Sequence, residues 1–191
     1  MDLIFATHNN HKFKEVATQL PTHINLLSLS DLNFNEEIPE PFNTLEENAT
    51  TKAETIYNRF SKACFSDDTG LFVPSLDGAP GVYSARYAGP QATAIQNIEK
   101  LLDALKEKED RAAFFKTVVV LKTAAAQYIF EGVVQGHIAR KLQGQGGFGY
   151  DPIFIPEGYN ESFAQLDRSI KHSIGHRGKA MAALLKHLEK L

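Results

Sequence analysis

The chain has 191 residues, of which 43% are hydrophobic and 23% charged, and its formal net charge is −3. This composition is typical of a globular protein, and no apolar run approaches the roughly 20 residues that a membrane span requires, so we expect no membrane-embedded part. Basic residues are scattered along a weakly acidic chain, which argues against binding of long nucleic acid.

The length predicts a single domain over residues 1–191. The first residues, MDLIFATHNN, lack the basic region and cleavage site of a signal peptide, so we expect a cytoplasmic protein. The only cysteine, Cys64, excludes an internal disulfide, and its place on the apolar side of a predicted helix favours a buried structural role.

Hydrophobic periodicity predicts the following elements in the first half of the chain. In order they are a buried strand, a helix, a second strand, an acidic proline-bearing loop, a long helix and a strand with a turn, at residues 3–6, 12–20, 24–30, 35–43, 45–63 and 64–73. Thr44 and Glu47 form a capping-box pattern at the start of the long helix.

The second half is richer in β-structure. Its sequence predicts a loop at residues 74–89, an amphipathic helix carrying Ile95 at 93–106, and two antiparallel strands joined near Ala124 at 112–123 and 127–140. A glycine-rich loop at 144–150, a short strand at 153–155 and a helix from about Gly178 follow. Helices at both ends of a central hairpin indicate a mixed sheet and an α/β fold class.

The segment ATHNNHK, residues 6–12, leads from a strand through a polar loop into a helix. Free backbone N–H groups at such a helix start, with Lys12 nearby, suit a phosphate group. The alternative is that Asn9 or Asn10 only caps the helix.

The segment DDTG, residues 67–70, places two carboxylates side by side on a strand. Neighbouring side chains point to opposite faces, so we expect one of Asp67 and Asp68 to face a cleft while the other bonds locally. Together with Glu40 it would supply the hard oxygen ligands that Mg²⁺ prefers. The alternative is a turn without chemistry.

On the long helix, Asn48 and Lys52 fall on one edge of the apolar face, whereas Glu47 points away from it. Lys52 is therefore a candidate functional residue, and a lysine whose stem covers apolar surface is the alternative.

The segment GGFGYDPIF, residues 146–154, surrounds two aromatic residues with glycine. Phe148 or Tyr150 could stack on a flat base, and Asp151, because it precedes proline, is expected to be extended and to lie near the loop. The alternative is a turn that packs one aromatic ring into the core. In KHSIGHRGKA, residues 171–180, His176 and Arg177 stand where we expect the last helix to begin, as donors to a ligand or as a basic surface.

Six segments in this order resemble the Ham1 or inosine triphosphatase family of pyrophosphatases for non-standard purine nucleoside triphosphates. They are FATHNNHK, PEPFNTLEENATTKA, DDTGLFV, GAPGVYSARYAG, GGFGYDPIF and KHSIGHRGKA. The resemblance implies an elongated mixed sheet with two lobes and a central cleft, and a homodimer. It also implies hydrolysis of ITP, dITP and XTP to the monophosphate and pyrophosphate.

The resemblance implies Mg²⁺ at Glu40 and Asp68, with Asp68 also accepting the proton of the attacking water. The implied phosphate ligands are Thr7, Asn9, Lys12, Lys52 and Lys171. Thr69 stands where the family has serine. The implied base pocket comprises Phe148, Gly149, Tyr150 and Asp151, with His176 and Arg177 as its reading edge.

Three positions depart from the family pattern. His8 replaces a glycine in the phosphate loop, Gly175 replaces a serine before His176, and Phe42 with Asn43 changes the acidic loop, so Glu40 is assigned by counting back from Thr44. Two other functions stay open: a nucleotide sensor without turnover, and a pyrophosphatase for modified pyrimidine nucleotides.

Overall fold

The computed structural model describes residues 1–190, and the chain in it divides into two compact units. Unit 1 comprises residues 1–68, 117–132 and 177–190, and unit 2 comprises residues 69–116 and 133–176. The long strands β3 (Cys64–Phe72), β5 (Ala112–Lys122) and β6 (Gln127–Ile138) each contribute residues to both units.

In unit 1 the strand order is β2-β1-β3-β5-β6, and β1 pairs in parallel with both β2 and β3. The remaining elements of this unit are β1 (Asp2–Phe5), α1 (Asn10–Ala17), β2 (Asn25–Leu27), α2 (Leu45–Phe60) and α5 (His176–Leu188), the last from Arg177 on.

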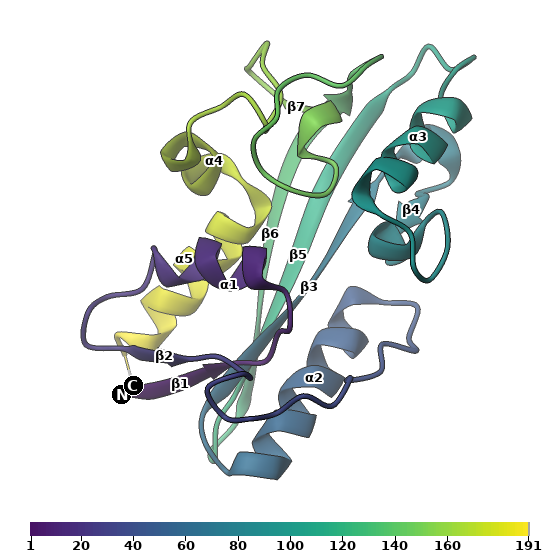
Figure 1. Ribbon diagram of the computed structural model, residues 1–191. Coiled ribbons are helices and arrows are strands. Elements are labelled where there is room, and N and C mark those ends of the chain that lie inside the picture. Colours follow the sequence, from purple (N-terminus) through teal and green to yellow (C-terminus); the bar gives the residue numbers. More distant parts are fainter. Residues whose placement is uncertain (191) are drawn as a thin grey trace. The chain divides into compact units, whose positions relative to one another are not determined.

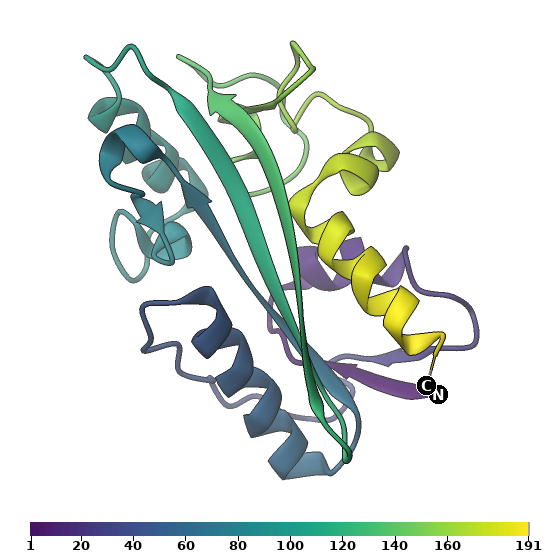
Figure 2. The ribbon, with the colours of Figure 1, turned by 180° about the vertical axis from the view of Figure 1, so that it is seen from behind.

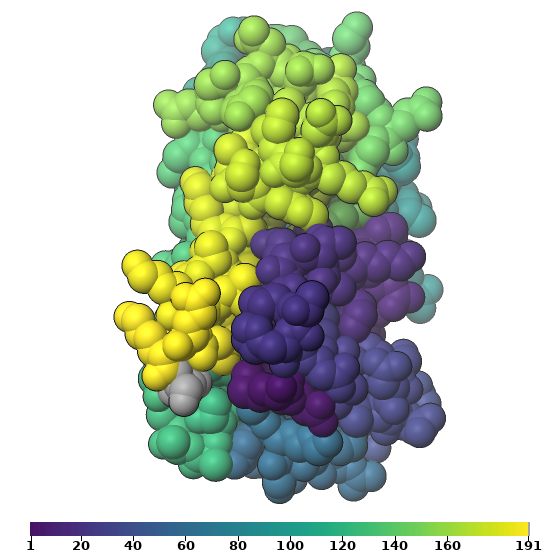
Figure 3. All heavy atoms as spheres, turned by 90° about the vertical axis from the view of Figure 1, so that its left-hand side faces the viewer, coloured from purple at the N-terminus to yellow at the C-terminus, as the bar shows by residue number. Residues whose placement is uncertain are grey.

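Helices cover both faces of the unit 1 strands. Alternate strand residues point to opposite faces, so each face packs its own side chains against helices. Phe5 and Phe65 stack at 4.4 Å in a cluster that also contains Val16 of α1 and Met181 of α5. On the other face, Cys64 and Ser66 of β3 donate to backbone carbonyls of α2. Figure 1 shows α2 and the pair α1 and α5 on the two sides of these strands, and Figures 2 and 3 show α5 next to α1.

In unit 2 the order is β4-β3-β5-β6-β7, and β4 and β7 pair antiparallel with their neighbours. Its other elements are β4 (Pro80–Gly81), α3 (Ala94–Ala104), β7 (Phe154–Pro156), α4 (Arg168–Ile174) and three short 3₁₀ helices at Pro74–Leu76, Ser84–Arg86 and Asp151–Ile153. The core of this unit includes Leu71, Leu101, Phe154 and Phe163.

The mixed α/β class is confirmed, whereas several local predictions are wrong. β3 runs without the predicted turn and carries Cys64, which we had placed on a helix; the cysteine is buried, and burial raises the pKa of its thiol to about 12. Residues 74–89 form two 3₁₀ helices and a strand rather than a plain loop. Helix α4 was not predicted, and α5 begins at His176.

Helix caps agree with the sequence in part. Thr44 is the N-cap of α2 and accepts from the backbone N–H of Glu47, and its hydroxyl donates to the Glu47 carboxylate. The reciprocal capping box lies instead at α3, between Thr93 and Gln96. Ile95 of that helix is 49% exposed, although periodicity placed it on the apolar face.

Candidate active site

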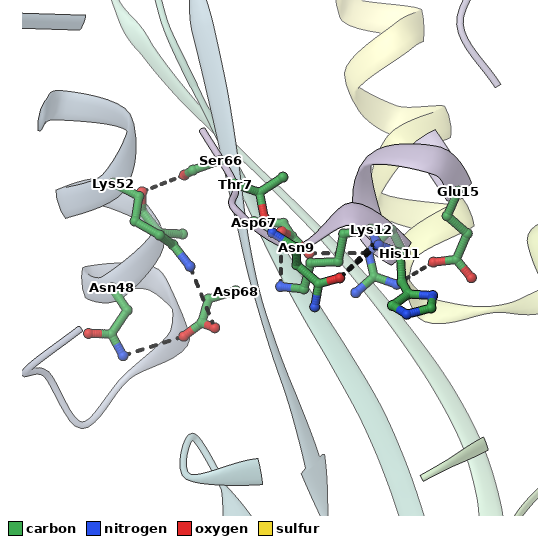
Figure 4. Close-up of polar contacts among 12 residues, drawn as sticks. Thr7, Asn9, His11, Lys12, Glu15, Asn48, Lys52, Ser66, Asp67 and Asp68 are labelled. Carbon is green, nitrogen blue, oxygen red and sulfur yellow. Dashed lines mark hydrogen bonds and ion pairs between the residues drawn. The ribbon is translucent and has the colours of Figure 1, made fainter. Parts of the chain in front are cut away.

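The two carboxylates of β3 lie on opposite faces of the unit 1 strands, as predicted (Figure 4). Asp67 accepts from Lys12 Nζ at 3.0 Å and from Arg177 Nε at 3.2 Å. Asp68 lies on the α2 side, where Asn48 Nδ2 is 3.4 Å and Lys52 Nζ 3.8 Å from its oxygens. Lys12 and Arg177, the partners of Asp67, come from α1 and α5, far from it in the sequence.

The Lys52 ammonium lies beside both carboxylates that are predicted to hold a metal, Glu40 and Asp68. It donates to Glu40 Oε1 and lies 3.8 Å from Asp68 Oδ1. Lys52 is only 8% exposed, so its side chain is buried beside these two acids and does not extend into solvent. Glu40, which was assigned by counting back from Thr44, therefore lies beside the same lysine as Asp68.

Asn48 lies one helical turn before Lys52 and is fully buried. Its side-chain amide accepts from the backbone N–H of Phe42 at 3.0 Å and donates to the Phe42 carbonyl at 3.1 Å, in addition to its contact with Asp68. The sequence placed Asn48 correctly on the helix but gave it no role. Its spacing of four residues from Lys52 was the available signal.

The loop before α1 holds the predicted phosphate ligands Thr7, Asn9 and Lys12. Asn9 is the N-cap of α1, since its Oδ1 accepts from the backbone N–H groups of His11 and Lys12 at 2.9 and 3.1 Å. Thr7 Oγ1 accepts from the Asn9 N–H at 3.1 Å. The capping interpretation therefore holds for the Asn9 oxygen, and Lys12 is turned toward Asp67.

His8 does not take the left-handed backbone conformation that favours glycine, since it is absent from the residues of positive φ. The histidine at this position is therefore compatible with the loop backbone, and its ring contacts Phe34 and the Glu36 carbonyl.

Burial and neighbouring charges oppose one another at these acids. Burial disfavours ionisation of Asp67, but Lys12 and Arg177 outweigh it and hold the pKa of Asp67 well below its usual range. Burial raises the pKa of Asp68, and Lys52 and Lys12 do not fully offset it. Burial likewise opposes the charge of Lys52, yet Asp68 and Glu40 raise its pKa. The pKa of Asp68 therefore lies above its ordinary value despite the neighbouring lysines.

Arg177 belongs to the charged network of unit 1. Its guanidinium donates through Nη1 to Glu15 at 2.5 Å and through Nε to Asp67, and it is 4% exposed. Although burial opposes its charge, Asp67 and Glu15 raise the pKa of Arg177. The resemblance implied a base-reading role, whereas two of its donor atoms are engaged by these carboxylates. Glu15 was not singled out from the sequence.

The glycine-rich loop of unit 2 folds back on Asp151. Asp151 Oδ2 accepts from the Phe148 N–H at 2.8 Å and from Lys171 Nζ at 2.7 Å, and Lys171 Nζ lies 4.9 Å from the Phe148 ring centre. Gly147 and Gly149 have φ of +71° and +59°, which explains the glycines. Asp151 is near the loop as predicted, but its backbone is in a 3₁₀ helix rather than extended.

Lys171 and Tyr150 have surroundings that differ from those implied. Lys171 was expected at the phosphates, and its ammonium lies on Asp151 in the segment expected to hold the base. Tyr150 packs in the core of unit 2, 5% exposed, and its hydroxyl donates to the Ser84 carbonyl at 2.8 Å. Between the two aromatic residues, the structure therefore favours Phe148 for stacking.

Tyr150→Phe tests this assignment. The variant removes only the hydroxyl that bonds to Ser84, so we expect a loss of about 1 kcal/mol in the free energy of unfolding, measured by urea denaturation. The KM for a nucleotide substrate should stay within about twofold, since the ring remains in the core. A KM raised tenfold or more would contradict the core assignment.

His176, Thr69 and Gly175 complete the predicted set. The His176 ring is 5% exposed and stacks on Phe115 with ring centres 4.5 Å apart. Thr69 follows Asp68 in β3. At Gly175 an added Cβ would collide with the Lys171 carbonyl oxygen, so this backbone requires glycine and would have to shift to accept the serine of the family pattern.

The acids Glu40 and Asp68 fit a divalent cation by the chemistry of their oxygens. Among residues 1–190, no three His, Cys, Asp or Glu side chains gather as a metal site. The protein would therefore supply two carboxylates, which is the number Mg²⁺ usually takes when substrate phosphates and water complete its shell.

No helix within residues 1–190 is long and apolar enough to cross a membrane.

The fold and these residues define an α/β protein in which two carboxylates, Glu40 and Asp68, lie beside the Lys52 ammonium at the α2 side of β3. The chain belongs to the Ham1 family, whose model matches residues 3–187.

Relatives cover the whole chain. It is 51% identical over 190 residues to the dITP/XTP pyrophosphatase of Christiangramia forsetii, covering 100% of both chains. It is 43% identical to that of Bacillus subtilis, covering 98% of this chain and 97% of the relative. Among solved structures, the Ham1 protein of Staphylococcus aureus matches with a TM-score of 0.91 at 36% identity, covering 100% of this chain and 99% of that chain.

Proposed function

We propose that this protein is a dITP/XTP pyrophosphatase that hydrolyses non-standard purine nucleoside triphosphates to the monophosphate and pyrophosphate. One observation carries the proposal: the buried Asp68 and Glu40 both lie beside the Lys52 ammonium. Relatives named dITP/XTP pyrophosphatase at 40 to 51% identity support the substrate class.

In the proposed reaction, water attacks the α-phosphorus and the bond from that phosphorus to the bridging oxygen breaks, releasing pyrophosphate. Asp68 accepts the proton of the water, since a raised pKa makes it a stronger base than an ordinary aspartate. Lys52 and Lys12 stabilise the charge that builds on the phosphates. Mg²⁺ bound by Glu40 and Asp68 would act as a Lewis acid toward phosphate oxygens.

Selectivity is proposed to arise at unit 2. Inosine and xanthosine carry a 6-oxo acceptor where adenosine carries an amino donor. Donors such as His176 and the N–H groups of loop 146–150 would pair with the oxygen and stay unpaired opposite the amino group, which rejects adenine strongly. Phe148 would stack on the base, a contact worth about 1 to 3 kcal/mol.

The test measures pyrophosphate released by the purified protein from dITP, ITP, XTP, dGTP, dATP and a pyrimidine nucleoside triphosphate, with and without MgCl₂. The proposal predicts release from dITP and XTP that requires the metal, and at least about a hundredfold lower kcat/KM for dATP. Absence of release from dITP, ITP and XTP would overturn it, and preference for a pyrimidine triphosphate would redirect it to modified pyrimidines. Homodimer formation and a cytoplasmic location stay predictions.

A further inference from the structure

The acidic segment Glu36–Phe42, which carries Glu40, is held at both ends by side chains of other elements. At one end, His8 Nε2 lies 2.9 Å from the Glu36 carbonyl oxygen, and the His8 ring stacks on Phe34 with centres 6.1 Å apart and planes 13° apart. At the other end, the Asn48 amide bonds to both backbone groups of Phe42.

The histidine contact has a defined direction. A carbonyl oxygen only accepts, so Nε2 of His8 must carry a proton. Both the neutral Nε2–H tautomer and the imidazolium satisfy this condition.

The segment has little regular structure to hold it otherwise. Residues 35–41 belong to no helix or strand, and several of them, including Glu36 and Glu37, are exposed. Glu40 has an exposed fraction of 30% for its side chain, against 10% for Asp68. Glu40 is thus the more exposed of the two acids, and it lies on a segment outside any helix or strand, so its position depends on what holds the segment.

We propose that His8 and Asn48 are positioning residues that fix the two ends of the segment Glu36–Phe42 and so hold Glu40 beside Lys52 and Asp68. The side-chain amide nitrogen of Asn48 donates both to the Phe42 carbonyl and to Asp68. Asn48 therefore fixes the Phe42 end of the segment relative to that acid. His8 secures the other end from the phosphate loop. This inference rests on the proposed function in assigning Glu40 to a metal, but the link itself does not.

The experiment compares wild type with His8→Gly, which removes ring and hydrogen bond, and His8→Phe, which keeps the ring that stacks on Phe34. His23→Gly is the matched control, because His23 is an exposed histidine of the same unit. Amide hydrogen exchange of peptides covering residues 34–43 is measured on the metal-free protein. The concentration of MgCl₂ that gives half-maximal pyrophosphate release from dITP is measured in parallel.

We expect exchange of the Phe34 and Phe42 amides, which donate to the Leu29 carbonyl and to Asn48 Oδ1, to become about five to ten times faster in His8→Gly, the effect of losing one net hydrogen bond, and to be intermediate in His8→Phe. The half-maximal MgCl₂ concentration should rise several-fold in His8→Gly. His23→Gly should match wild type in both measurements.

Unchanged exchange in His8→Gly would overturn the link. Faster exchange with an unchanged MgCl₂ requirement would overturn the claim that the link positions Glu40. If wild type releases no pyrophosphate, the proposed function has failed, and the exchange measurement alone still decides whether His8 holds the segment. The two failures are therefore distinguishable.

Discussion

Replacing Asp68 with asparagine is expected to lower kcat for pyrophosphate release from dITP by about a thousandfold, the range that loss of a proton acceptor costs. The amide keeps the shape of the side chain but neither accepts the proton of water nor supplies an anionic oxygen to a metal. The measurement is pyrophosphate release at saturating dITP and MgCl₂.

The same variant should not lose stability. Burial raises the pKa of Asp68, which means that folding disfavours its charged form at neutral pH. Removing that charge leaves the Tm unchanged or higher, a pattern expected where a charge is kept for function. Loss of activity together with a lower Tm would indicate a structural role instead.

Asp2→Asn is the matched control, because it makes the same chemical change at an exposed aspartate of unit 1. It should retain wild-type turnover. If Asp68→Asn keeps more than about a tenth of wild-type kcat, Asp68 is not the proton acceptor.

The second large effect is expected for Arg177→Met, which should lower the free energy of unfolding by about 3 to 5 kcal/mol at pH 7. Arg177 is 4% exposed, and its removal deprives Glu15 and Asp67 of a buried cation. Arg59→Met is the control, since Arg59 is exposed in α2, and it should change stability by less than about 0.5 kcal/mol. Urea denaturation measures both.

The pH dependence of stability gives an independent check on the same network. The pKa of Asp67 is held well below that of an unfolded aspartate, about 3.9, so its ion pairs stabilise the fold above that pH. This contribution is lost as the pH falls from about 5 toward the low pKa of the folded state. Wild type should therefore lose stability in this range.

In Arg177→Met the loss over this pH range should be smaller, because one of the three cations that depress the pKa of Asp67 is gone. An identical slope in both proteins would contradict the assignment of Arg177 to Asp67. Combining Glu15→Gln with Arg177→Met should recover part of the lost stability, since it removes one uncompensated acid.

The sequence by itself predicted the α/β class, the opposite faces of Asp67 and Asp68, and the edge of α2 that carries Asn48 and Lys52. These follow from periods of 2 and 3.6 residues, which are local properties of the chain. The six ordered segments also predicted the family. Local patterns failed where structure depended on partners, as at Asp151, which begins a 3₁₀ helix, and at α4, which has only seven residues.

Only the tertiary structure decided which acid meets which cation. Lys12, Asp67 and Arg177 come from three separate elements, and no spacing along the chain indicates that α1 and α5 pack on the same face of β3. It likewise decided that Tyr150 lies in the core and that His8 reaches Glu36, because burial and contact depend on residues far apart in sequence. Periodicity fixes the direction of a side chain, whereas packing chooses its partner.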